Sequence, residues 1–462
     1  MKRRILSLWM VAVAVAAIVS GCGNGANLLD TVPADVMAVG LVDIKEVCSD
    51  AGLEFGDKGV KPSATIEGHV NRQTLNLLDV AAMLHHEGVA DMTRVALIAD
   101  GAHNGYITFF INNFDKFKEL CGTNVEWTGN RDGYQTADIP ALANGRLVAV
   151  KNQVWITTAD VKAVRALRES AEALPLTRSY GVTEALGEPA VVRMAVDKNF
   201  ISRINGNTSD DKASPEDKNW LIVTADQGAD GSLTAQWHEI NAEGKTVKTP
   251  GMQRINPAML AYVPADFSMV AAMGVNGDFD WEPLEQTALM VGGFQGAAFM
   301  SIAAPYLQAI DGTVLVAARP KLTGNPDDVS DYDFLVLAKM PRKKIEGLLN
   351  MVRTMLFTSG ISPDWDASQG IMTFPQYGGM FYMGEVDGCL GISTVPFDNT
   401  RNNPLAPQFV NKDMALSADA GAILPALRGL TLSVSMDAGR GDIRISGNPS
   451  VGSVFAYLLS LN

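Results

Sequence analysis

Residues 30–44 read DTVPADVMAVGLVDI, and residues 261–275 read AYVPADFSMVAAMGV. Both stretches place the tetrapeptide VPAD directly before an apolar run, and the two copies lie 231 residues apart. Proline favours an extended backbone at the start of a strand, and aspartate suits a turn. We therefore expect each copy to lead into the first strand of a structural unit, and we interpret the repetition as an internal duplication.

Other patterns recur in the same order and at similar spacing. An apolar strand followed by an amphipathic helix is expected at 106–121 (YITFFINNFDKFKELC) and again at 334–349 (FLVLAKMPRKKIEGLL), with Phe117 matching Ile345. Three further matches are Trp127 with Trp365, Gly145 with Gly379, and a hairpin at 221–237 with one at 430–445. Longer helices are expected at 73–85 and 295–310.

These patterns predict two tandem homologous units, residues 28–254 and 255–462. Strands with hairpin-length connections indicate an α+β fold in which each unit is a largely antiparallel sheet with helices packed on one face. The polar segment 205–219 (NGNTSDDKASPEDKN) has no counterpart in the second unit. We expect it to be a mobile loop inserted in the first unit.

The N-terminus has the features of an export signal. Residues 1–21 combine a basic start, an apolar run and small residues before a cleavage point, and the run is too short to span a bilayer comfortably. The sequence VSGC, residues 19–22, resembles the bacterial lipobox, in which the cysteine is acylated and becomes the mature N-terminus. The resemblance makes Cys22 the lipidated residue and residues 22–27 a short tether. The alternative is an ordinary signal peptide with an incidental cysteine.

The family resemblance rests on this N-terminal region. The lipobox, the polar tether and the stretch VPADVMAVGLVDIKEVCSDAGL (residues 32–53) look like a group of uncharacterised Gram-negative envelope lipoproteins that carry a domain of unknown function. The likeness covers the N-terminal third of the chain and implies an envelope location but no catalytic residues. By resemblance to lipoprotein sorting rules, Gly23 after Cys22 favours the outer membrane, on its periplasmic face, with exposure at the cell surface as the alternative.

Charge and cysteine content limit the partners and the compartment. Removal of residues 1–21 leaves 34 basic and 51 acidic residues, a net charge of −17, which argues against a nucleic-acid partner. Besides Cys22, the chain has Cys48, Cys121 and Cys389, too few for a fold built on disulfides. A bridge between Cys48 and Cys121 is left open, and Cys389 is interpreted as a buried strand thiol.

No common hydrolase or nucleotide-binding motif occurs in the chain. His85 and His86 are adjacent on a predicted helix, so they point about 100° apart and would not chelate one ion easily. The acidic run at 327–333 is interpreted as a solvated turn. We therefore expect no catalytic residues, no cofactor and no metal site.

The leading functional hypothesis is a membrane-anchored envelope lipoprotein with a non-catalytic binding or scaffolding role. Its expected partners are the membrane, through the lipid on Cys22, and an envelope protein or an apolar ligand. One alternative is a periplasmic carrier of an apolar ligand, which requires a cavity of several hundred cubic ångströms. Another is a hydrolase that works through paired carboxylates.

Overall fold

The computed structural model describes residues 28–447 and 454, apart from 65, 68–69, 71, 102–103, 123–124, 130–131, 140–143, 199–217, 229, 283–303, 322–331, 377–378, 420 and 422–428. The predicted signal 1–21, the tether 22–27 with Cys22, and most of the predicted loop 205–219 therefore lie outside the described residues. The chain divides into two compact units, which we call unit 1 (residues 1–247 with 444–462) and unit 2 (residues 248–443).

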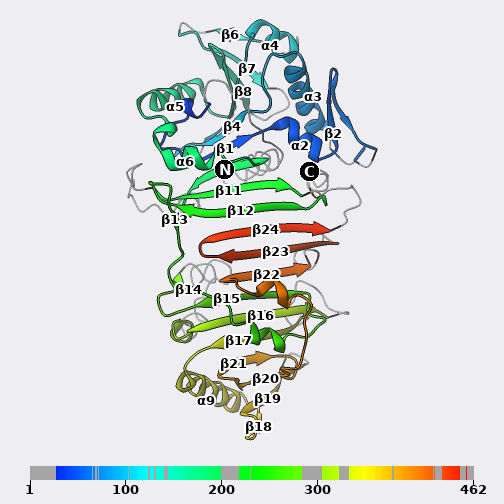
Figure 1. Cartoon of the computed structure of the whole chain (residues 1–462), viewed down its shortest axis with the longest axis vertical. Helices are drawn as coiled ribbons and strands as arrows, with labels where there is room; N and C mark the ends of the chain where they lie inside the picture. The colour runs from blue at the N-terminus through cyan, green and yellow to red at the C-terminus, as the bar shows by residue number, and fades with distance from the viewer. Residues whose placement is uncertain are drawn as a thin grey trace. The chain divides into compact units, whose positions relative to one another are not determined.

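Unit 1 contains both helices and strands (Figure 1). Its elements, in which η denotes a 3₁₀ helix, are η1 (Leu28–Thr31), β1 (Ala38–Val42), α2 (Ile44–Asp50), β2 (Leu53–Gly56), β3 (Gly59–Pro62), α3 (Arg72–His86), β4 (Val95–Ala99), β5 (Gly105–Phe110), α4 (Phe114–Cys121), β6 (Thr128–Gly129), β7 (Gln135–Ile139), β8 (Gly145–Val150), β9 (Gln153–Thr157), α5 (Val161–Ala173), η2 (Leu176–Arg178), α6 (Tyr180–Ala185), β10 (Val192–Asp197), β11 (Trp220–Gln227), β12 (Leu233–Ile240) and β13 (Thr246–Val247).

The helices of unit 1 begin at recognisable capping residues. Asp43, Asn113 and Asp160 precede α2, α4 and α5, and each side chain accepts a hydrogen bond from the backbone amide three residues later. Such caps satisfy an amide that has no partner within the helix. The predicted helix at 73–85 is confirmed as α3.

The sheet of unit 1 is antiparallel throughout its described pairings and runs in the order β6-β7-β8-β9-β5-β4-β1-β10-β11-β12. The expectation that helices pack on one face is wrong for this unit. One core joins α2, α3 and α4 to one face, and a second core joins α5 and α6 to the other. In β4 (VALIA), successive residues alternate between these two cores, which is why the strand reads as a continuous apolar run.

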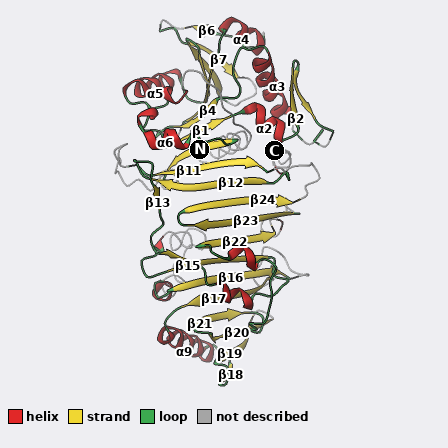
Figure 2. Ribbon diagram, in the orientation of Figure 1, coloured by secondary structure: helices red, strands yellow, loops and turns green. Residues whose placement is uncertain are grey.

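Unit 2 has fewer described helices and longer strands (Figure 2). Its elements are β14 (Met252–Gln253), η4 (Pro257–Tyr262), β15 (Met269–Val275), β16 (Gly312–Pro320), β17 (Tyr332–Lys339), α9 (Arg342–Thr358), β18 (Asp364–Asp366), β19 (Ile371–Gln376), β20 (Gly379–Val386), β21 (Cys389–Ser393), η6 (Ala406–Phe409), β22 (Met414–Asp419) and β23 (Leu430–Asp437), followed by β24 (Arg440–Gly447) at the unit boundary. Of the predicted helix at 295–310, residues 295–303 lie outside the described residues and 304–307 are helical.

The sheet of unit 2 is also antiparallel, in the order β18-β19-β20-β21-β17-β16-β15-β22-β23. Helix α9 packs on one face, where Ile345 and Leu349 are buried. The other face is covered by η4, η6 and the segments around them. The antiparallel α+β class that the sequence predicted is thus confirmed for both units.

The described strands follow the same path in the two units. If β1, β4 and β5 are matched with β15, β16 and β17, and β6 to β11 with β18 to β23, nine strands have the same order along the chain and the same order in the sheet. Helix α4 directly follows β5, and helix α9 directly follows the matched strand β17. Their matched residues Phe117 and Ile345 are both buried.

Both VPAD copies also occupy equivalent places. Each follows a 3₁₀ helix, buries its valine completely, and precedes an inner strand of its sheet. In unit 1, the carbonyl of Met37 accepts a hydrogen bond from the amide of Asp197 at 2.8 Å, and in unit 2 the carbonyl of Ser268 accepts one from Asp419 at 3.0 Å. VPAD leads into β1, the first strand of unit 1, as predicted. In unit 2 it leads into β15, which follows the two-residue strand β14.

Register corrects one match that the sequence suggested. Arg146 and Tyr382 face equivalent hydroxyl residues across the β8–β9 and β20–β21 hairpins. The residue of unit 2 that corresponds to Gly145 is therefore Phe381, and Gly379 lies two residues earlier. Both strands begin with glycine, but β20 has eight residues and β8 has six. The two first glycines therefore do not occupy equivalent positions.

Candidate functional site

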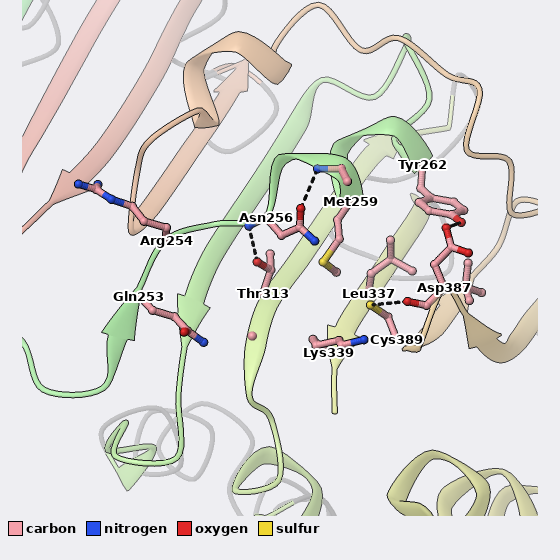
Figure 3. Close-up of a pocket in the computed structure, with 13 residues that line it drawn as sticks. Gln253, Arg254, Asn256, Met259, Tyr262, Thr313, Leu337, Lys339, Asp387 and Cys389 are labelled. Atoms are coloured by element: carbon pink, nitrogen blue, oxygen red, sulfur yellow. Dashed lines mark hydrogen bonds between the residues drawn. The ribbon is translucent and has the colours of Figure 1, made fainter. Parts of the chain in front are cut away.

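A pocket of about 220 Å³ opens in unit 2, between η4 and the strands β16, β17, β20 and β21 (Figure 3). It is lined by Gln253, Arg254, Asn256, Ala258, Met259, Tyr262, Gly312, Thr313, Leu337, Lys339, Val386, Asp387 and Cys389. The tight turn between β20 and β21 supplies Asp387, and the end of β17 supplies Lys339. The pocket therefore gathers side chains from positions more than one hundred residues apart.

The inner wall of the pocket is apolar. Met259, Leu337, Val386 and Cys389 are all less than one-tenth exposed and belong to the core between η4 and the sheet. Burial raises the pKa of the Cys389 thiol, so that this side chain stays neutral at physiological pH. The prediction that Cys389 is a buried strand thiol is confirmed. The inner wall can therefore accept an aliphatic or otherwise apolar group.

Tyr262 and Asp387 form the polar end of the pocket. The Tyr262 hydroxyl donates a hydrogen bond to Oδ2 of Asp387 at 2.6 Å (Figure 3). Burial, together with this hydrogen bond, raises the pKa of Tyr262 to about 12, so the phenol keeps its proton and remains a donor. This arrangement uses one carboxylate oxygen of Asp387. Its other oxygen has no hydrogen bond to the described residues.

Lys339 enters the pocket beside Cys389, its direct cross-strand neighbour in β17 and β21. Two glycines leave room for its side chain. A Cβ on Gly312, whose φ is +137°, would lie 2.6 Å from the Lys339 Cγ, and a Cβ on Gly388 would lie 2.7 Å from its Nζ. The Lys339 side chain is exposed and has no hydrogen bond or ion pair with any residue that the structure describes. It is thus a cation available to a ligand.

The second cation at the pocket is already neutralised. Arg254 contacts Asp413 at 3.3 Å and Asp437 at 2.7 Å, and it also donates to the carbonyl of Asn411 at 2.5 Å. Asn256 is held in place because its backbone amide donates to the Thr313 hydroxyl at 2.7 Å. Lys339 and Asp387 are therefore the charges with capacity for a ligand in this pocket.

Unit 1 fills the equivalent place with a buried polar cluster. By strand register and by the VPAD match, Cys389, Leu337 and Tyr262 correspond to Gln153, Thr108 and Thr31. The Gln153 amide donates hydrogen bonds to the hydroxyls of Thr31 and Thr108, both at 2.9 Å, and its side chain is 3% exposed.

Unit 2 thus has Cys389, Leu337 and Tyr262 at the positions where unit 1 has this hydrogen-bonded cluster, and all three line the pocket.

The residues that the sequence had singled out lie elsewhere. Cys22 is outside the described residues, so its lipidation stays a prediction. Cys48 and Cys121 are free, so no bridge joins them. Burial lowers the pKa of His85, whose Nδ1 lies 4.0 Å from Asp91. Among the described residues, no group of histidine, cysteine and acidic side chains has the geometry of a metal site.

Of the acidic run at 327–333, residues 327–331 lie outside the described residues, and Asp333 binds Arg319 at 2.9 Å. The matched tryptophans have equivalent positions but different surroundings. Trp127 packs edge-on against Phe114 of α4, with ring centroids 5.2 Å apart, whereas Trp365 is 42% exposed.

Sequence reasoning did not find the pocket residues Tyr262, Lys339 and Asp387. A weak signal was present, because Tyr262 directly precedes the second VPAD and Asp387 opens an Asp-Gly hairpin turn. Both features were explained by local structure. Only the fold brings them together with Lys339.

The chain has no detectable relative among the known proteins with which it was compared: no family model, no curated protein and no solved structure matches it. The resemblance of its N-terminal region to envelope lipoproteins therefore stays a prediction. None of the described helices combines the length and the apolar character needed to span a bilayer.

Proposed function

We propose that this chain is an exported lipoprotein, anchored to the outer membrane by a lipid on Cys22, whose unit 2 binds a small molecule without catalysing a reaction. The anchor rests on the lipobox-like sequence at residues 19–22 and favours the periplasmic face. The binding role rests on one observation, that unit 2 has a pocket with an apolar wall, Lys339 and Asp387 where the matched side chains of unit 1 form a buried hydrogen-bonded cluster.

The duplication is part of this proposal. The shared strand order and the equivalent VPAD hydrogen bonds support descent of both units from one ancestral unit. A duplicated unit allows one copy to keep a structural role while the other acquires a site. A hydrogen-bonded cluster in unit 1 and a pocket at the matched place in unit 2 are consistent with such a division of roles.

The pocket supports the alternatives less well. A carrier of a purely apolar ligand would not need Lys339 and Asp387 at the binding site, and about 220 Å³ is below the ~300–1,000 Å³ of typical ligand sites. A glycosidase-like hydrolase needs two carboxyl groups across a cleft, and Asp387 is the single carboxylate that lines this pocket.

The anchor is tested by changing Cys22. We expect Cys22→Ser to move the protein from the membrane fraction to the soluble fraction, because acyl chains contribute about 0.8 kcal/mol per buried methylene. Cys48→Ser, which alters a cysteine inside the fold, serves as the matched control and should remain in the membrane fraction. Retention of the Cys22→Ser protein on membranes would contradict the proposed anchor.

The binding role is tested by native mass spectrometry of the mature chain, released gently from its own membranes. We expect a bound molecule of defined mass, which is lost in a Cys389→Leu variant because the larger side chain fills the inner wall. Cys121→Leu makes the same exchange at a half-buried site in unit 1 and should keep the ligand. Equal ligand occupancy in both variants would show that this pocket is not the binding site.

A further inference from the structure

We infer that the pocket of unit 2 takes a small zwitterion with an aliphatic body, such as an α-amino acid of the leucine type. This inference rests on the proposed binding function and specifies its ligand. The pocket presents one available cation, Lys339, and one carboxylate with an unused oxygen, Asp387, and these two residues make no ion pair with each other.

The two charges lie on opposite sides of Cys389, with Lys339 on one side and the Asp387 carboxylate toward Tyr262 on the other (Figure 3). A ligand of one charge would be attracted by one of these residues and repelled by the other. A zwitterion satisfies both, because its carboxylate can face Lys339 and its ammonium group can face Asp387. Hydrogen bonds between ionised partners are about twice as strong as neutral ones.

Tyr262 fixes the acidic end of the site. Its hydroxyl occupies Oδ2 of Asp387, which leaves Oδ1 to accept from the ligand. Gly312 and Gly388 leave room for the basic end, since a Cβ at Gly312 would lie 2.6 Å from the Lys339 Cγ and one at Gly388 would lie 2.7 Å from its Nζ. Arg254, the other cation at the pocket, does not compete with Lys339 for the carboxylate of the ligand, because it is paired with Asp413 and Asp437. The fold therefore holds Asp387 through Tyr262 and leaves space for Lys339 at the other end of the pocket.

Size and polarity define the rest of the ligand. A volume of about 220 Å³ corresponds to roughly seven water molecules at liquid density, which suits a compact molecule and excludes a lipid chain or a folded peptide. Met259, Leu337 and Val386 supply an apolar wall for a branched aliphatic group. The closed cluster of unit 1 has neither charge, so the inference applies to unit 2 alone.

Three matched probes test this chemistry. Leucine carries both charges, 4-methylpentanoate is leucine without its amino group, and 3-methylbutylamine is leucine without its carboxylate. Binding is measured by isothermal titration calorimetry with the complete lipoprotein in lipid nanodiscs, and empty nanodiscs provide the background. We expect leucine to bind at least about tenfold more tightly than either analogue.

Variants then assign each charge to a residue. Lys339→Met should weaken leucine at least about tenfold and should not weaken 3-methylbutylamine, which has no carboxylate and is freed from the repulsion of the lysine. Asp387→Asn should weaken leucine similarly and should not weaken 4-methylpentanoate, which is freed from the repulsion of the aspartate. Lys343→Met changes an exposed lysine of α9 outside the pocket and should alter none of the three.

The outcomes separate this inference from the proposed function. If the analogues bind as tightly as leucine and compete with it, the zwitterion inference is overturned while the binding pocket stands. If no probe binds and native mass spectrometry finds no ligand that Cys389→Leu displaces, the proposed binding function is itself overturned.

Discussion

Thr157 of unit 1 and Ser393 of unit 2 make the same pair of hydrogen bonds at the same point of their sheets. The Thr157 hydroxyl donates to the carbonyl of Gly105 at 2.7 Å and accepts from the amide of Ala159 at 3.0 Å. The Ser393 hydroxyl donates to a carbonyl of β17 at 3.0 Å and accepts from the amide two residues further on at 3.0 Å. Both side chains are buried, at 3% and 0% exposure.

Removal of either hydroxyl should destabilise its unit. Thr157→Val and Ser393→Ala each leave an amide and a carbonyl that are at least partly buried without this partner, and we expect each to lower the free energy of unfolding by ~1–3 kcal/mol. Thr158→Val changes the exposed neighbour of Thr157 and should cost less than ~0.5 kcal/mol. Chemical denaturation measures all three, and equal effects of Thr157→Val and Thr158→Val would contradict the prediction.

The N-cap of α2 gives stability a defined pH dependence. Burial raises the pKa of Asp43 to about 6, well above its ordinary value, although the amide of Glu46 binds the carboxylate. Between about pH 4 and pH 6 the native protein binds this proton more readily than the unfolded chain, so stability should fall as pH rises through that window and level off above it. The contribution is at most about 3 kcal/mol.

Asp43→Asn should remove this part of the pH dependence, because asparagine caps a helix nearly as well and carries no charge. We expect the variant to gain stability relative to the parent as pH rises from 4 to 6, and to be more stable at pH 7, when urea unfolding is measured at several pH values. Asp160→Asn, at the exposed cap of α5, provides the control for the exchange itself. A constant difference between Asp43→Asn and the parent protein would refute the assignment.

Unit 1 contains a buried lysine, Lys218, which lies beside the end of β10. Lys218 is 4% exposed, donates to the carbonyl of Val36 at 2.9 Å, and lies 3.6 Å from the carboxylate of Asp197. Lys218→Met would remove this ion pair and the hydrogen bond to Val36 from a buried site, and we expect a loss of ~3–5 kcal/mol in the free energy of unfolding. The double variant with Asp197→Asn should recover part of this loss.

The exposed pair of Lys198 and Glu239 supplies the comparison for Lys218. These side chains are 3.1 Å apart, and that of Lys198 is 58% exposed. Solvent screens such pairs, so Lys198→Met should cost less than ~1 kcal/mol. Similar losses for the Lys198 and Lys218 variants in thermal or chemical unfolding would show that burial does not govern the Lys218 interaction.

The three cysteines of the fold should be free and slow to react. Burial raises the pKa of Cys48 to about 12 and that of Cys121 to about 11, so little thiolate is present at pH 8. We expect iodoacetamide to label Cys48 roughly a hundredfold or more slowly in the native protein than after unfolding. Under non-reducing, denaturing conditions three thiols should react, including Cys389. One reactive thiol would instead indicate a bridge between Cys48 and Cys121.

The sequence by itself predicted the periodic and local features. VPAD identified the strands β1 and β15, and the amphipathic pattern identified α4 and α9. Trp127 directly precedes β6, and Trp365 lies within the matched strand β18. These features depend on residues close together in the chain, where turn chemistry and hydrophobic spacing act directly. The same local information gave the antiparallel α+β class.

Only the tertiary structure decided which side chains share a space. Helices cover both faces of the sheet in unit 1 because β4 is apolar on both sides, a pattern that periodicity alone does not resolve. The pocket depends on Tyr262, Lys339 and Asp387, which strand pairing brings together across more than one hundred residues. At the matched position of unit 1, the buried amide of Gln153 finds two hydroxyl partners, Thr31 and Thr108, which only the fold brings beside it.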